Sequence, residues 1–120
     1  MDREIFMNQM NSDNLKHYDD KERLDVISRS VISNAGDGNP LGHRNLIIVT
    51  EELAELAKEV TKELRGKGDK VSITEELADV ALGIDSVKYI CNIKDEDLQK
   101  AIDIKLKRLD DIISKGKKYL

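Results

Sequence analysis

The chain has 120 residues and a formal net charge of −4, from 20 lysines and arginines against 24 aspartates and glutamates. This length suits one domain with a single modest core, and the negative charge disfavours general binding to nucleic acid, because the chain and a phosphate backbone would repel one another. Aromatic residues make up only 3% of the chain and proline occurs once, so we expect an all-α fold with an aliphatic core rather than a β-sandwich rich in turns.

Residues 1–18 are polar and show no sustained hydrophobic period, so we interpret them as a partly ordered N-terminal arm, followed by a single domain over residues 19–120. The arm lacks the basic start and the apolar segment of a signal peptide. No apolar run approaches the ~18 residues that a membrane span needs, and the single cysteine, Cys91, cannot form a disulfide within the chain. We therefore expect a cytoplasmic protein that does not enter a membrane.

Apolar residues recur at helical spacing from Asp20 onward, and this pattern predicts a first helix that ends at Asn34. The stretch 36–42 contains three of the seven glycines and the only proline, which predicts a loop. A longer apolar stripe then predicts a second helix from about His43 to about Arg65.

A third helix is expected to begin at Ser72, which forms a capping-box pattern with Glu75, and to continue to Cys91. The apolar residues from Leu98 to Ile113 outline a fourth. The few residues between the second and third helices favour an antiparallel pair. Wide apolar stripes in so small a chain further predict that part of the apolar surface is buried against a second copy.

Two acidic pairs lie at i, i+3 spacing on the second and third helices, Glu52 with Glu55 and Glu76 with Asp79. Residues three apart project from the same side of a helix, so each pair offers two oxygen ligands together. Such pairs arise by chance in so acidic a chain. These two differ in their placement, because each borders the apolar stripe of its helix and the two helices are expected to face each other.

Carboxylates that converge beside an apolar surface repel one another, and partial desolvation would push at least one of them to bind a proton. A hard divalent cation relieves this conflict. Magnesium prefers oxygen ligands and keeps waters or substrate phosphates in its remaining positions, which suits phosphoryl chemistry. From the residues alone, a solvated acidic face explains the pattern equally well.

The two acidic pairs lie in similar blocks, Glu-Glu-Leu-Ala-Glu-Leu at 51–56 and Glu-Glu-Leu-Ala-Asp-Val at 75–80. An ExxE block followed by an ExxD block resembles the MazG-like all-α nucleoside triphosphate pyrophosphohydrolases. The resemblance covers about residues 46–90. It implies a four-helix core of antiparallel helices, usually completed by assembly into a homodimer or homotetramer.

The resemblance also implies an enzyme that converts a nucleoside triphosphate to the monophosphate and pyrophosphate by attack of water at the α-phosphorus. Carried over by motif, Glu52, Glu55, Glu76 and Asp79 would hold Mg²⁺, for which Mn²⁺ could substitute. Glu52 or Glu55 would orient or deprotonate the water. Phosphoribosyl-ATP and deoxyuridine triphosphate are alternative substrates within the same chemistry.

Three basic residues are further candidates for contacts with substrate phosphates. Members of the family often carry a basic residue and an asparagine on the last helix; this chain has Lys105 and Arg108 there but no asparagine nearby. Their alkyl stems could equally cover apolar surface. Arg44 stands at the start of the second helix, where backbone N–H groups favour anions, although the preceding loop lacks the Gly-Lys-Ser/Thr ending of a P-loop.

A second hypothesis from the sequence is a non-enzymatic interaction or regulatory module. In that case the acidic faces are solvated and the apolar stripes pair with another chain. The stripes themselves do not separate the two hypotheses. Stabilisation by a divalent cation does, because only clustered carboxylates gain from one.

Overall fold

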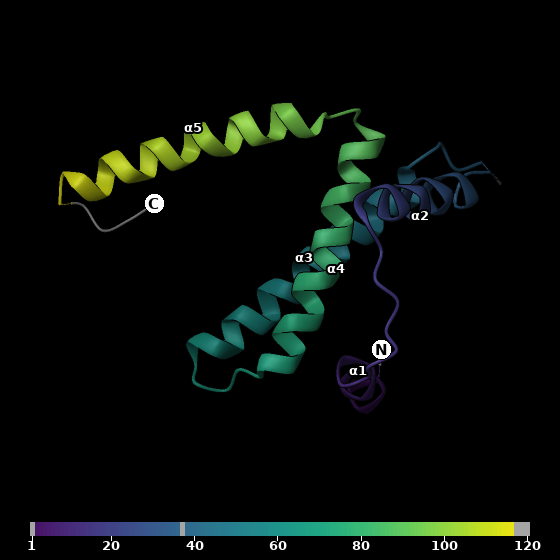
Figure 1. The fold of residues 1–120 in the computed structure, drawn as a ribbon, viewed down its shortest axis with the longest axis horizontal. Helices are drawn as coiled ribbons and strands as arrows, with labels where there is room; N and C mark the ends of the chain where they lie inside the picture. The colour runs from purple at the N-terminus through teal and green to yellow at the C-terminus, as the bar shows by residue number, and fades with distance from the viewer. Residues whose placement is uncertain (1, 37, 117–120) are drawn as a thin grey trace.

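A computed structural model of the protein describes residues 2–36 and 38–116, and over these residues it is all-α, without a β-strand. Figure 1 shows the helices of this described part, which are α1 (Arg3–Met10), α2 (Asp20–Ser33), α3 (His43–Leu64), α4 (Lys70–Ile90) and α5 (Asp95–Ser114). The all-α prediction is confirmed. The four predicted helices correspond to α2 to α5, whose bounds differ from the predicted ones by a few residues.

The short helix α1 lies within the N-terminal arm and packs against α4. Asp2 caps α1 by accepting hydrogen bonds from the backbone N–H groups of Glu4 and Ile5. Arg3 reaches Asp69 with two parallel hydrogen bonds, Nε to Oδ2 and Nη2 to Oδ1, each 3.0 Å long. The sequence had offered no hydrophobic period for this helix, and a side-chain contact to a distant residue holds it.

Asp69 is also the N-cap of α4, where it accepts a hydrogen bond from the backbone N–H of Val71. The predicted cap, Ser72, instead donates its hydroxyl hydrogen to Asp69. The hydrogen bonds from Arg3 and Ser72 hold the pKa of the Asp69 carboxyl well below its usual range. One ionised aspartate therefore starts α4 and anchors the arm.

Helices α3 and α4 form the predicted antiparallel pair, which is the main helix contact of the fold. Their close approach depends on Gly83, which is buried in the middle of α4. A Cβ atom at this position would lie 3.3 Å from a methyl group of Val49 on α3. The absence of a side chain at Gly83 therefore lets the two backbones approach closely in the middle of the pair.

Helix α2 packs across α4 and also contacts α3. It contributes Ile27 and Val31, the two buried hydrophobic residues of the described chain. The end of α2 is joined to the start of α3 through buried Asn45, which accepts a hydrogen bond of 3.0 Å from the Asn34 amide and donates one of 3.2 Å to the Ser30 hydroxyl. This network satisfies the polar groups of Asn45 where α2 meets α3.

Val31→Ala is expected to lower the free energy of unfolding by about 2 kcal/mol, because it removes two methyl groups from a fully buried site and leaves a cavity. The neighbouring Ile32 is 59% exposed, so Ile32→Ala serves as a control that should change stability by about 0.5 kcal/mol or less. Urea unfolding followed by circular dichroism measures both. Equal losses in the two variants would contradict this packing of α2.

Helix α5 departs from the predicted arrangement. Within the described residues it packs against none of the other helices, and Figure 1 shows it running away from the α3–α4 pair. An ion pair of 2.5 Å between Lys88 of α4 and Asp95 of α5 spans the bend between the two helices. The single chain therefore shows the α3–α4 pair with α2 packed on it but not a complete four-helix core, because α5 does not pack on the other helices. None of the described helices is long and apolar enough to span a membrane.

Candidate metal centre

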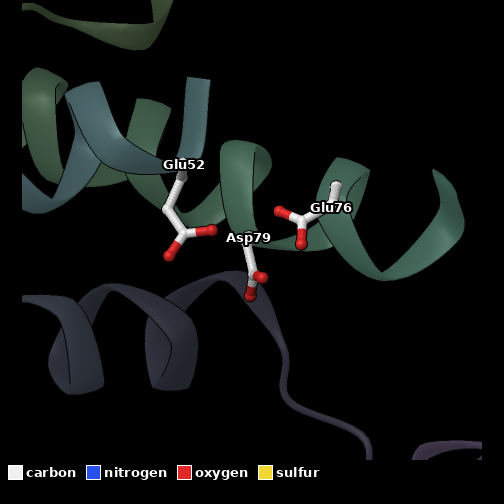
Figure 2. A group of neighbouring side chains, drawn as sticks. All are labelled: Glu52, Glu76 and Asp79. Carbon is white, nitrogen blue, oxygen red and sulfur yellow. The ribbon is translucent and has the colours of Figure 1, made fainter. Parts of the chain in front are cut away.

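Three carboxylates from α3 and α4 meet near the middle of the helix pair. Glu52, Glu76 and Asp79 each offer one oxygen, and these oxygens all lie within 4.8 Å of one another. Figure 2 shows the three side chains grouped together, with Glu52 coming from α3 and the other two from α4. We call Glu52, Glu76 and Asp79 the carboxylate trio.

Local geometry explains why the three side chains meet. Glu76 and Asp79 are three residues apart on α4 and therefore share one side of that helix. Glu52 follows Val49 by three residues on α3, and Val49 packs on Gly83. The close contact of α3 and α4 at Gly83 thus places Glu52 across from Asp79.

The trio is electrostatically strained when no cation is bound. Burial raises the pKa of Glu52 to about 7, with the negative charges of Asp79 and Glu76 as further causes. Burial, followed by the charge of Asp79, also raises the pKa of Glu76. Glu52 and Glu76 are therefore harder to ionise than isolated carboxyl groups, as expected where like charges share a partly desolvated site.

No described cationic side chain relieves this strain. None of the ion pairs formed within residues 2–36 and 38–116 involves a member of the trio. The Oε2 atom of Glu76 is buried and has no hydrogen-bond partner. A buried carboxylate oxygen without a partner is costly, and a divalent cation with oxygen ligands would satisfy it. The donor set thus fits a hard cation.

Glu55, the fourth acid of the predicted set, is exposed and lies outside this group. It remains a neighbour of the site, because its negative charge is one of the causes that raise the pKa of Glu76. The structure therefore brings three of the four predicted ligands together and leaves Glu55 at their edge.

The three basic candidates are all exposed. Lys105 and Arg108 lie on α5, which packs against neither α3 nor α4 in the described chain, so the structure does not bring them to the trio. Arg44 lies in the first turn of α3, two turns before Glu52.

The sequence interpretation missed the role of Gly83 in positioning the trio. An isolated glycine inside a helical pattern lowers helix stability and, where present, suggests a close packing contact. Gly83 carries this signal, since it is an isolated glycine near the middle of the sequence of the third predicted helix.

The raised pKa of Glu52 predicts a pH-dependent stability for the metal-free chain. The folded pKa, about 7, lies above the ordinary value of 4.5, so the folded state binds the proton more tightly than the unfolded state. The resulting stability is fully present below about pH 4.5 and is lost as the pH rises through 7. Because the site is only partly buried, we expect a loss of about 1–2 kcal/mol.

Urea unfolding in the presence of a chelator at pH 5 and at pH 8 measures this loss. Glu52→Gln carries no titratable group at the position and should flatten the difference between the two pH values. If the free energy of unfolding fell equally between pH 5 and pH 8 in the wild type and in Glu52→Gln, another group would cause the pH dependence.

Comparisons of the chain with family models, with curated proteins and with solved structures give no match.

Proposed function

We propose that the protein is a Mg²⁺-dependent nucleoside triphosphate pyrophosphohydrolase, which converts a ribo- or deoxyribonucleoside triphosphate to the monophosphate and pyrophosphate. The observation that carries the proposal is the carboxylate trio, in which oxygens from two helices lie within 4.8 Å of one another and a buried oxygen of Glu76 has no partner. The ExxE and ExxD blocks and their resemblance to the MazG-like family support the same chemistry.

In this proposal Glu52, Glu76 and Asp79 hold Mg²⁺, with Mn²⁺ as a substitute. The bound ion would neutralise the triphosphate and lower the pKa of a water. The trio itself bears the negative charge that attracts the ion, and its rigid placement on two packed helices fixes where the ion sits.

Glu55 is the better candidate for handling the attacking water. Glu52 is engaged in the trio, whereas Glu55 lies at its edge and is exposed. A carboxylate in that position can accept a hydrogen bond from water and take up its proton as the oxygen attacks the α-phosphorus. The leaving group is pyrophosphate.

The proposal includes a cytoplasmic location and assembly into a homodimer or homotetramer. A chain that leaves as many large apolar side chains exposed as this one is expected to cover some of them by association. The same exposed surface is the observation that favours the second candidate function, a helical interaction module without catalytic activity.

The experiment that tests the proposal is the release of monophosphate and pyrophosphate from a panel of nucleoside triphosphates, with Mg²⁺ or with a chelator. The panel includes deoxyuridine triphosphate and phosphoribosyl-ATP. Metal-dependent release of both products is expected for at least one substrate. Release of inorganic phosphate instead would place the cleavage at another bond, and no release from any substrate would favour the interaction module.

A further inference from the structure

The single chain exposes far more surface than a compact protein of its size. Its accessible surface is 9659 Å² for a mass of 13.6 kDa, whereas a compact monomer of that mass exposes about 6,600 Å². The radius of gyration is 17.5 Å, against about 13.6 Å for a compact domain of this length. The excess of roughly 3,000 Å² exceeds the ~800 Å² per partner of a standard interface and is typical of chains that fold together.

Helix α5 accounts for part of this excess. It is 20 residues long and, apart from the ion pair between Asp95 and Lys88 at its first residue, packs against no other described helix. Its apolar residues recur at helical spacing, yet Ile102 and Leu106 are 43% and 55% exposed. Most of the stability of a helix in a protein comes from packing of its apolar face, and the single chain does not provide this packing for α5.

Helices α3 and α4 expose a matching apolar surface. Leu46, Leu53 and Val60 recur every seven residues on α3, and Leu77 and Ile84 do so on α4. These five side chains are all exposed. Their spacing forms an apolar stripe along each helix. We call these five residues the outer stripe.

The outer stripe and the carboxylate trio lie at different angles around each helix. On α3, successive residues are rotated by about 100°, and Val49, which packs on α4, falls between Glu52 and Leu53 around the helix axis. On α4, Gly83 falls between Asp79 and Ile84 in the same way.

The bend between α4 and α5 directs α5 away from its own chain. Only residues 91–94 connect the two helices. Asn92 has a positive φ of 54°, and the ion pair between Lys88 and Asp95 spans the bend. The length of α5 matches that of its acceptors, because α3, α4 and α5 have 22, 21 and 20 residues.

We propose that α5 is exchanged between two copies of this chain, so that the apolar stripe of α5 in each copy packs on the outer stripe of the other. The exchange completes in trans the four-helix bundle that the single chain lacks. The arrangement is isologous, since each copy gives one helix and accepts one. The inference rests on the homo-oligomer of the proposed function and adds the surface that forms it; it does not require hydrolytic activity.

Light scattering of the full chain tests the first consequence, for which a dimer or a multiple of a dimer is expected. A monodisperse monomer would overturn the proposal. Ile102→Arg places a charge in the α5 stripe and should produce monomers or loss of folding. Lys100→Glu changes the charge on a different face of α5 and, as the matched control, should keep the wild-type assembly.

Cross-linking between chains tests the exchange itself without disrupting the fold. In a Cys91→Ser background, a chain with Leu53→Cys is co-expressed with a differently tagged chain with Ile102→Cys and treated with a bis-maleimide. A covalent heterodimer is expected. Its absence from a dimeric protein, or cross-linking only within one chain in the double variant Leu53→Cys/Ile102→Cys, would overturn the exchange.

These measurements involve neither nucleotide nor metal ion. A failure of the exchange therefore leaves the hydrolase proposal standing. Equally, absence of pyrophosphate release has no bearing on where α5 packs.

Discussion

Asp79→Asn is expected to reduce metal-dependent pyrophosphate release by at least about 100-fold, because the neutral amide removes one of three charged ligands while keeping the shape of the side chain. Changes to groups that merely orient metal ligands already cost 10–100-fold, and loss of a ligand should cost no less. The measurement is the initial rate of release at a fixed concentration of Mg²⁺ with the best substrate from the panel.

The fold of this variant should remain intact. Asp79 contributes to raising the pKa of both Glu52 and Glu76, so removing its charge relieves repulsion in the metal-free chain. Urea unfolding in chelator should therefore give a stability equal to or above that of the wild type. If the variant lost both its rate and its fold, the loss of rate would not locate the site. The unfolding measurement therefore distinguishes loss of a metal ligand from loss of the fold.

Glu51→Gln is the matched control for Asp79→Asn. Glu51 is the exposed neighbour of Glu52 on α3 and, one residue away, points about 100° around the helix from it. Its loss changes the net charge as much as the loss of Asp79 does, and it should leave the rate near that of the wild type. If Asp79→Asn also kept the wild-type rate, the trio would not be the catalytic site.

Helix bounds and the facing of α3 and α4 could be predicted from the sequence because both are local properties. Hydrophobic period and the glycine-rich loop set the ends of α2 and α3, and the short connection after α3 favours an antiparallel neighbour. The same helical period places the two acids of each pair on one side of their helix. The meeting of Glu52 with Asp79 was therefore predictable once the two helices were expected to face each other.

The exact membership of the trio was not predictable, because it depends on how closely and at what rotation two helices pack. The i, i+3 rule places Glu55 beside Glu52 but does not say which of them points at α4. Gly83 fixes the close approach to Val49, and this contact between distant residues places Glu52 inside the group while Glu55 stays exposed.

The arrangement of α1 and α5 could not be predicted from the sequence, for two different reasons. Helix α1 is held by an ion pair between Arg3 and Asp69, which are 66 residues apart, and two such residues carry no recognisable pattern. Helix α5 has a clear apolar stripe, which predicts that the helix is covered but not by what. The sequence therefore does not say whether the same chain or a second copy covers this stripe.

The two candidate functions make opposite predictions for a divalent cation, and the thermal stability of the chain decides between them. A ligand that binds only the folded state stabilises it by about 2.7 kcal/mol at 100 times its dissociation constant. For a domain of this size, each kcal/mol corresponds to very roughly 4 °C. Near-saturating Mn²⁺ or Mg²⁺ is therefore expected to raise the Tm by about 10 °C over the value in chelator.

This shift should disappear in Asp79→Asn and persist in Glu51→Gln, because only the first substitution removes a ligand of the trio. Differential scanning fluorimetry over a titration of Mn²⁺ measures the Tm shift in all three proteins. An interaction module with solvated acidic faces should show no shift in any of them. An equal shift in all three would mean that the ion binds elsewhere, whereas the expected pattern would place it at Glu52, Glu76 and Asp79 before any substrate is identified.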